Sequence, residues 1–221
     1  MAKWTLAQSH NGSFTMGLMP KQPRRPGPMA AQQGQMHVQK RPAGKPVIVE
    51  TENFTMRSLK ASDVGPTFIS WFEDPTVMAG LNLPEGGITR ENLRGYVNEY
   101  DNQKKYLIGV FTKPDQRMVA YYSIDINREH KVAQISYVIG NSDYRSGHKL
   151  DEMYDVICDY FLENRSVDKL VARVVSTNYR ALFMMKQSRF TFEAVLKKDN
   201  ILPDGGRTDI VQFYRLRDGL D

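Results

Sequence analysis

The sequence predicts one mixed α/β domain, α+β in arrangement, over residues 47–221, with a mostly antiparallel central sheet flanked by helices. Three observations predict it. Segments rich in β-branched and aromatic residues are separated by short polar turns, and amphipathic segments of helical length lie between some of them. The first 46 residues show neither period, so we expect residues 1–46 to be a flexible basic extension.

The basic character of the chain comes from this extension. Seven of the 30 Lys and Arg residues lie in residues 1–49, which contain none of the 25 Asp and Glu residues. Residues 50–221 therefore carry a net charge of −2, whereas a nucleic-acid-binding domain would carry positive charge on a folded face. The extension is either a flexible leader or an arm that binds a protein or nucleic-acid partner.

Composition also limits the class of protein. No apolar run approaches the roughly 20 residues that a membrane-spanning helix needs, so we expect no membrane span. The single cysteine, Cys158, excludes an intrachain disulfide and fits a reducing compartment. No His/Cys cluster has metal-ligand spacing, so no metal is expected. These features favour a cytoplasmic protein, either a monomer or a homodimer.

The first part of the domain is predicted to contain one strand and two helices. Val47 to Leu59 is rich in β-branched and aromatic residues and predicts a strand. Ser62 can cap a helix that runs to about Glu73, just before Pro75. Thr89 can cap a second helix. Its apolar stripe consists of Leu93, Tyr96, Val97 and Tyr100.

The second part predicts a sheet with one parallel crossover. The expected strands are 106–112, 118–126, 132–140, 169–176, 190–195 and 210–216, and the expected helices are about 147–164 and 180–188. The first three strands should pair antiparallel, because their connections are short. The strand, helix and strand over 132–176 are long enough for a right-handed parallel connection. Strands can separate where pairing changes from antiparallel to parallel, and a cleft can open there.

Five segments, in order and with similar spacing, resemble the GNAT superfamily of acyl-CoA N-acyltransferases. The resemblance covers about residues 47–218 and is greatest to the branch that contains the ribosomal-protein N-acetyltransferases. The segments are ETENFTMRSLKASD (50–63), WFEDPTV (71–77), ISYVIGNSDYRSGHKLDE (135–152), STNYRALFMMKQSRFTFEAVL (176–196) and RTDIVQFYRL (207–216).

This resemblance implies that acetyl-CoA or another acyl-CoA binds between the 132–140 and 169–176 strands as the acyl donor. Backbone groups of the central strand would pair with the amides of the pantetheine arm. Asn178 would cap the following helix and contact a cofactor amide. The central-strand residues that the resemblance assigns to the donor are Tyr137, Val138, Ile139 and Gly140.

The phosphate loop departs from the family pattern of Arg or Gln, two residues, Gly, one residue, then Gly or Ala. Counted from Arg145, the two small positions hold His148 and Leu150, and the nearest glycine is Gly147. The loop is either blocked or remodelled around Gly147, with basic side chains contacting phosphate. The residues that the resemblance assigns to the phosphates are Arg145, Ser146, Gly147, His148, Lys149 and Leu150.

The catalytic groups also depart from the family. The tyrosine that often protonates the leaving thiolate is replaced by Met184, so Ser188 or a water would have to serve. For the general base, the candidates are Glu73 beside the acceptor-side helix, His130 in the turn before the central strand, and Asp209 at the start of the last strand.

The function that the resemblance implies is an N-acyltransferase, in the first place an N-acetyltransferase. The acceptor would be the primary amine of a protein N-terminus, an amino sugar or another small molecule. Two alternatives remain open at this point. The domain could be a catalytically inactive GNAT-fold binding or regulatory module, or an acyltransferase that uses another acyl carrier.

Overall fold

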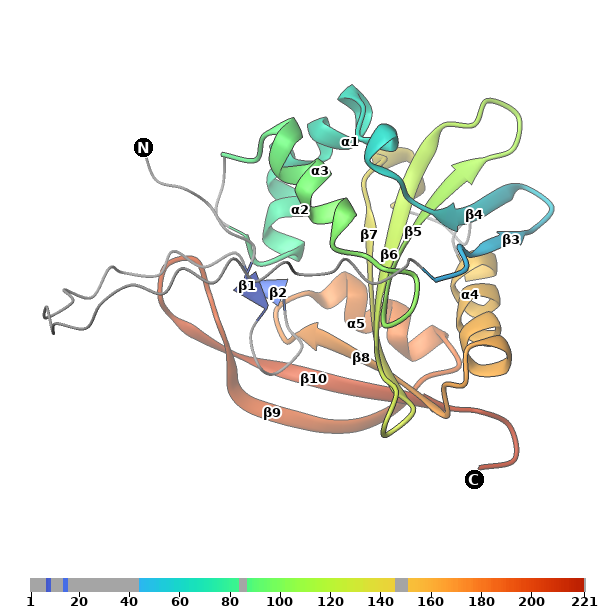
Figure 1. Cartoon of the computed structure of the whole chain (residues 1–221). Helices are drawn as coiled ribbons and strands as arrows, with labels where there is room; N and C mark the ends of the chain where they lie inside the picture. Colours follow the sequence, from blue (N-terminus) through green and yellow to red (C-terminus); the bar gives the residue numbers. More distant parts are fainter. Residues whose placement is uncertain (1–6, 9–13, 16–43, 84–86, 146–150, 221) are drawn as a thin grey trace, which may run out of the picture.

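The structure is a computed structural model that describes residues 7–8, 14–15, 44–83, 87–145 and 151–220. Its centre is an eight-stranded sheet in the order β3-β4-β5-β6-β7-β8-β10-β9, with helices on both faces (Figure 1). Two short strands, β1 (Ala7–Gln8) and β2 (Phe14–Thr15), pair antiparallel with each other.

The large sheet is mixed and mostly antiparallel, as predicted. Its strands are β3 (Ile48–Glu50), β4 (Phe54–Ser58), β5 (Lys105–Thr112), β6 (Met118–Asn127), β7 (Val132–Ile139), β8 (Lys169–Val175), β9 (Thr191–Ile201) and β10 (Arg207–Leu216). Every neighbouring pair is antiparallel except β7 and β8, which are parallel. The predicted crossover is thereby confirmed.

The expected single strand over residues 47–59 is a hairpin of β3 and β4. Thr51 N–H donates to Phe54 O at 2.9 Å, and Phe54 N–H donates to Thr51 Oγ1 at 3.1 Å. These bonds close a turn in the middle of the expected strand. A threonine hydroxyl that bonds a nearby backbone N–H favours such a turn over continued extension.

The expected helix from Ser62 to Glu73 is wrong, because the chain forms separate short helices there. They are the 3-10 turns Ala61–Asp63 and Trp71–Glu73, α1 (Pro66–Ser70) and α2 (Pro75–Gly80). Pro66 and Pro75 lack a backbone N–H and so begin helices rather than continue them. Asp74 caps α2 by accepting from Thr76 N–H at 2.8 Å.

The helix predicted after Thr89 is confirmed as α3 (Arg90–Asn98). Asn92 N–H donates to Thr89 Oγ1 at 3.2 Å, and Thr89 N–H donates to Asn92 Oδ1 at 3.1 Å. This reciprocal capping satisfies two backbone donors at the start of the helix. The predicted stripe is buried at Leu93, Tyr96 and Val97.

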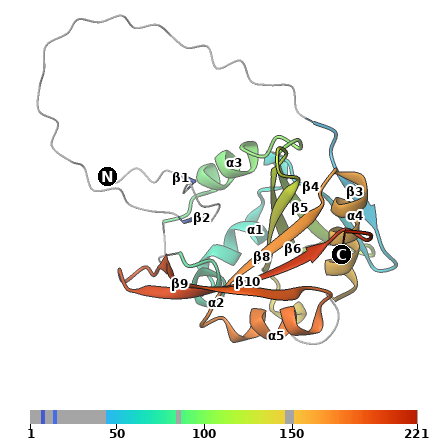
Figure 2. The same ribbon diagram turned by 90° about the horizontal axis from the view of Figure 1, so that it is seen from below.

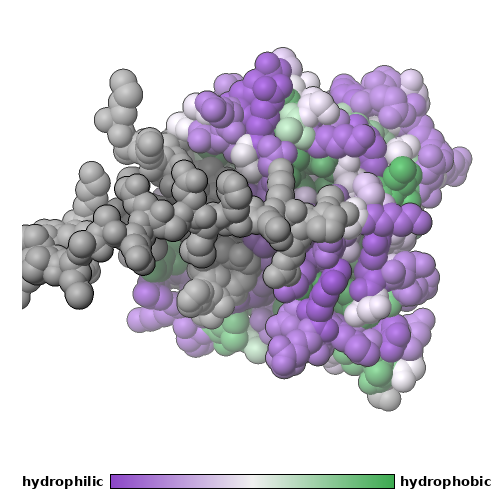
Figure 3. All heavy atoms as spheres, viewed as in Figure 1, coloured by the Kyte–Doolittle hydropathy of each residue, from purple (hydrophilic) through white to green (hydrophobic). Residues whose placement is uncertain are grey.

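Two hydrophobic cores lie on opposite faces of the sheet, because alternate side chains of each strand point to opposite sides. Helices α1 to α3 cover one face, and α4 (Asp151–Asn164) covers the other (Figure 2). Phe68 of α1 packs in the first core and Phe161 of α4 in the second. Cys158 is also buried in the second core, and this burial raises the pKa of its thiol. The described surface in Figure 3 is mainly hydrophilic.

The functionally important feature is the way in which β7 and β8 separate. They pair over four residues only, from Val132 opposite Lys169 to Ile135 opposite Ala172. Beyond this point β8 continues to pair with β10, whereas residues 136–139 of β7 pair with β6 alone. In Figure 1, β9 and β10 run across the direction of β5 to β7. The sequence-based expectation of a split sheet is confirmed.

Candidate functional site

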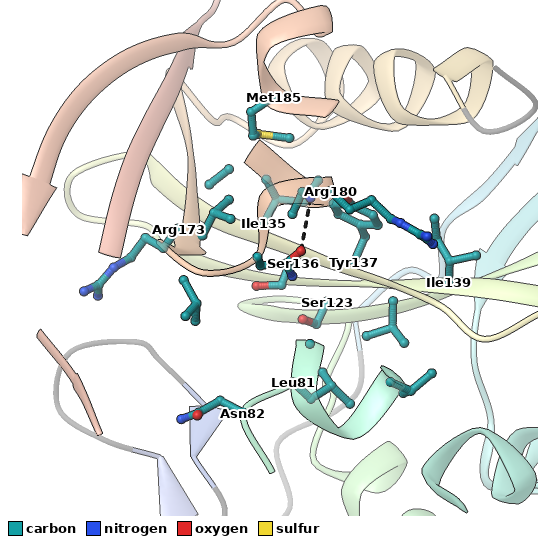
Figure 4. Close-up of a pocket in the computed structure, with 18 of the residues that line it drawn as sticks. Leu81, Asn82, Ser123, Ile135, Ser136, Tyr137, Ile139, Arg173, Arg180 and Met185 are labelled. Atoms are coloured by element: carbon teal, nitrogen blue, oxygen red, sulfur yellow. Dashed lines mark hydrogen bonds between the residues drawn. The ribbon is translucent and has the colours of Figure 1, made fainter. Parts of the chain in front are cut away.

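The separation of β7 from β8 opens a cleft of about 260 Å³. Strands β6, β7 and β8 line it together with α2 and with α5 (Tyr179–Gln187) (Figure 4). Its walls include Tyr121 and Val138 from one core and Tyr154 and Met185 from the other. The cleft therefore reaches both faces of the sheet, so two molecules could approach one point from opposite sides.

The cleft-facing backbone of β7 can be identified from its pairing with β6. Gly140 N–H donates to Val119 O at 3.1 Å, which places Gly140 in a hydrogen-bonded pair. Bonded and non-bonded residues alternate along antiparallel strands. Tyr137 and Ile139 therefore turn their backbone groups toward the side from which β8 has separated, and Val138 turns its groups toward β6.

Gly140 stands against Trp71, and this contact explains the glycine. A Cβ atom at position 140 would lie 1.8 Å from Cδ2 of the indole. Gly140 O accepts from Arg145 Nη2 at 2.8 Å, while its N–H is bound to Val119 O. Four residues were expected to offer backbone groups to a donor. The backbone groups of two of them, Gly140 and Val138, are thus directed to protein partners.

Arg145 holds the end of β7 to α2. Its guanidinium forms an ion pair with Asp74 at 2.6 Å and also donates to Ile139 O through Nε at 3.1 Å. Burial alone would raise the pKa of Asp74, but hydrogen bonds from Arg145 and Thr76 outweigh it and the pKa is lowered. The side chain expected to contact phosphate therefore joins β7 to the first turn of α2.

The remaining loop residues assigned to the phosphates, Ser146, Gly147, His148, Lys149 and Leu150, lie outside the described part of the chain. Asn178, by contrast, is well placed. Its side chain accepts from Ala181 N–H at 3.1 Å and caps α5, as predicted, and the residue lines the cleft.

Met184, which occupies the position of the family tyrosine in the resemblance, lies on α5. Met184 lies on a small separate pocket, while its neighbour Met185 is fully buried and lines the main cleft. Tyr154 donates its hydroxyl to the Met185 sulfur at 3.8 Å. Ser188 donates to Met185 O at 2.8 Å and accepts from Phe190 N–H, so its hydroxyl serves to end the helix.

The structure brings none of the three proposed bases to the lining of the cleft. Glu73 is exposed at the end of a 3-10 turn, and His130 is exposed in the turn that precedes the paired half of β7. Asp209 accepts from Lys198 N–H and forms an ion pair with Lys197 at 2.9 Å. These two contacts lower the pKa of Asp209 and hold it as a carboxylate away from the cleft.

Several lining residues were missed by the sequence reasoning. Ser123 and Ser136 lie opposite each other on β6 and β7, Asn200 comes from the end of β9, and Arg180 from the first turn of α5. Arg180 follows Asn178 by two residues, and this position could have indicated that it also lines the cleft. The other three could not be found, since only the folded sheet brings these strands together.

The described residues show neither a membrane-spanning helix nor a metal-binding cluster. No helix among them is both long and apolar enough to cross a bilayer. They also contain no group of three or more His, Cys, Asp and Glu side chains placed to hold a metal ion.

Solved structures show the same fold at low sequence identity. The ribosomal-protein-S5-alanine acetyltransferase of Vibrio fischeri superposes with a TM-score of 0.68 and 16% identity, covering 79% of this chain and 99% of that one. An acetyltransferase of Salmonella typhimurium that modifies the N-terminal serine of ribosomal protein L7/L12 gives 0.69 and 16%, covering 78% and 100%. The spermidine N-acetyltransferase of Vibrio cholerae, in complex with CoA and spermine, gives 0.65 and 17%, covering 76% and 97%.

No curated protein sequence matches the chain significantly. The family comparison is more informative: residues 53–191 match the model described as the acetyltransferase (GNAT) domain. This match spans more than half of the chain, from β4 to the start of β9, and includes the divergent β7–β8 pair that forms the cleft. The chain therefore belongs to the GNAT acetyltransferase family.

Proposed function

We propose that residues 47–221 form an N-acyltransferase domain that moves an acyl group, in the first place acetyl, from acyl-CoA to a primary amine. The observation that carries this proposal is the cleft between β7 and β8 in a chain of the GNAT family. Because the cleft reaches both faces of the sheet, donor and acceptor can meet from opposite sides. Such positioning of two reactants supplies much of the catalysis in a bimolecular reaction.

The donor would bind along the separated half of β7. The pantetheine arm carries amides, and the backbone groups of Tyr137 and the N–H of Ile139 face the cleft where β8 no longer runs beside them. The carbonyl of Ile139 is bound to Arg145. Asn178 and Arg180 stand at the start of α5 on the other wall. In Figure 4 the side chain of Arg180 extends toward Ile139. A guanidinium at this position suits the anionic end of a coenzyme.

The reaction itself requires little from this lining. The amine nitrogen attacks the thioester carbonyl, a C–N bond forms, the C–S bond breaks, and the amine loses one proton while the thiolate gains one. The described lining residues include no carboxylate and no imidazole, so water is the proposed proton acceptor. A thiol with a pKa near 8.5 can leave without a strong acid.

An amine without a protein base must arrive deprotonated. An α-amine with a pKa of about 7.8 is roughly one-seventh neutral at pH 7, whereas an alkylamine with a pKa of about 10.4 is neutral in about one molecule in 2,500. The proposal therefore favours acceptors of low pKa. It also implies a rate that rises with pH until the acceptor amine has lost its proton.

The test uses the full-length chain. We expect acetyl-CoA to bind in isothermal titration and free thiol to be released when an amine is added. The variant Ile139→Pro removes a cleft-facing N–H without removing a bond to β6, so it should weaken CoA binding about tenfold. Its control, Ile139→Ala, keeps the N–H and should retain most of the affinity.

Unchanged affinity in a folded Ile139→Pro protein would show that the donor does not use this strand. Absence of CoA binding by the wild-type chain would overturn the whole proposal.

Two observations favour a second candidate function. The family tyrosine is replaced by Met184, and the described lining holds no base, which also fits a non-catalytic module that binds CoA. The thiol-release assay separates the two functions. A module of this kind would bind CoA but release no thiol above the uncatalysed rate with peptides, amino sugars or polyamines at pH 7 to 9.

A further inference from the structure

One end of the cleft carries neutral polar side chains that the donor site does not explain. Ser123 and Ser136 form a cross-strand pair on β6 and β7, on the face that α1 to α3 cover. Among the described residues, neither hydroxyl has a hydrogen-bond partner. In Figure 4 the two serines lie between Arg180 and Met185 on one side and Leu81 and Asn82 on the other, with Ser123 nearer to Leu81. The face that they share with α1 to α3 is opposite the one on which Met185 of α5 packs.

Asn200 adds a buried amide to the same end. Its side chain lies at the end of β9, lines the cleft, and is only 7% exposed. Its Nδ2 is buried without a hydrogen-bond partner. The segment is held in place, because Asn82 Nδ2 donates to Ile201 O at 2.6 Å. A buried polar group without a partner is costly, and a ligand that supplies one removes this cost.

The charge of the cleft lining is unsuited to a polycation. No Asp or Glu occurs among the described residues that line the cleft, while Arg145, Arg173 and Arg180 do line it. Two carboxylates outside the lining already have cationic partners: Asp74 forms an ion pair with Arg145, and Asp199 forms one with Arg173. An ammonium group bound here would lose water without gaining a carboxylate.

We propose that Ser123, Ser136 and Asn200 form an acceptor subsite for an amine whose neighbouring group carries a hydrogen-bond-accepting oxygen, such as a carbonyl. This proposal rests on the proposed function, because it assigns the acceptor side of the same cleft. The Asn200 amide donates to that oxygen, and the two hydroxyls line the path to the thioester. Polyamines, which offer only ammonium groups, are poor ligands.

The test compares two amines that differ by one carboxamide, phenylalaninamide and phenethylamine. Their binding to the full-length chain is measured by titration in saturating CoA, which carries no acyl group and so permits no reaction. Each affinity is expressed per neutral amine, because the two amines differ in pKa. We expect phenylalaninamide to bind about two- to tenfold more tightly, the range of one hydrogen bond. Asn200→Ala should abolish this preference.

The matched control is Asn53→Ala, which alters an exposed asparagine in the β3–β4 turn and should leave the preference unchanged. A third variant, Asn200→Asp, introduces a carboxylate and should raise the affinity for spermidine. The melting temperature of each variant confirms that it is folded.

Equal binding of both amines by the wild type, or an undiminished preference in Asn200→Ala, would overturn the subsite. Failure of the two proposals can be told apart. Thiol release without the carboxamide preference removes the subsite and keeps the transferase. The preference without any thiol release keeps the subsite and removes the transferase. If CoA binds and no amine does, the subsite is wrong.

Discussion

The two halves of β7 belong to one continuous strand but lie in different environments. Residues 132–135 are paired on both sides, to β6 and to β8, and so every backbone group of this half can be satisfied within the sheet. Residues 136–139 are paired on one side only. The difference teaches that one strand can supply both the structural centre of the sheet and a binding edge, depending on where its neighbour leaves it.

Contacts on both sides keep the separated half apart. On one side β10 continues to pair with β8 as far as Val175, which commits that strand to the C-terminal sheet. On the other side the end of β7 is fixed to β6 by Gly140 and to α2 by Arg145. The cleft thus follows from strand pairing and packing.

The largest expected effect compares the two halves directly. Ile135 is 2% exposed in the paired half, so Ile135→Ala should lower the free energy of unfolding by about 3 kcal/mol, through lost burial and a residual cavity. Ile139 is only partly buried, and Ile139→Ala should cost about 1 kcal/mol. Urea denaturation measures both. Equal losses would contradict the distinction between the halves.

A second variant would break the contact that holds the separated half. In Gly140→Ala the added methyl group would overlap the Trp71 ring, so the end of β7 must shift. We expect about 2 kcal/mol of destabilisation together with weaker CoA binding. The matched control is Gly95→Ala in α3, where nothing lies within 4 Å of the new Cβ. This control should be neutral or stabilise the protein by up to about 1 kcal/mol.

Variants of Arg145 distinguish two roles for its side chain, which either holds β7 to α2 or contacts phosphate. If it holds β7 to α2, Arg145→Ala should reduce stability by about 1–2 kcal/mol, and Asp74→Asn should reduce it by a similar but smaller amount. In a double-mutant cycle the two losses should not add.

If Arg145 instead contacts phosphate, as the family resemblance implies, the outcome differs. Arg145→Ala would then weaken CoA binding about ten- to a hundredfold, with a strong salt dependence, while Asp74→Asn would leave the affinity unchanged or improve it. Titration of CoA into both variants at two salt concentrations decides between the accounts.

The smallest expected effect is a pH dependence at the same contact. The pKa of Asp74 is lowered in the folded state, so its stabilising contribution is present above the unfolded-state pKa and is lost as the pH falls through the folded-state pKa. Wild type should therefore lose slightly more stability than Asp74→Asn between about pH 5 and pH 3. Because Asp74 is partly exposed, we expect a difference below about 1 kcal/mol. Parallel curves would exclude this contribution.

Much of the fold was predictable, because its signals are local. The capping residue Thr89 marked α3, short polar turns marked the meander of β5 to β7, and the connection to β8 was long enough for a parallel crossover. The first helix was predicted wrongly, since its hydrophobic period continues across Pro66, where the backbone begins a new helix instead.

The candidate site was only half predictable. The backbone role proposed for Tyr137 and Ile139 and the cap at Asn178 were inferred from motif positions, and Asn178 does cap α5 beside the cleft. The proposed bases failed to reach the cleft, because charge and exposure in the sequence do not give the direction of a loop. Arg145 was assigned by its place in a motif, whereas the partner that occupies its guanidinium, Asp74, lies 71 residues earlier in the chain.

By itself the sequence indicated the strands and helices from α3 onward, the parallel crossover from β7 to β8, and the place where these two strands can part. Periodicity, helix caps and turns depend on residues that lie a few positions apart, so they can be recognised from short segments of sequence. Only the tertiary structure decided which side chains meet in the cleft. It brought Asn200 of β9 and Ser123 of β6 to the lining of one cleft and put Trp71 against Gly140, although these segments are separated by tens of residues. Such contacts depend on sheet order, twist and packing, to which every strand contributes.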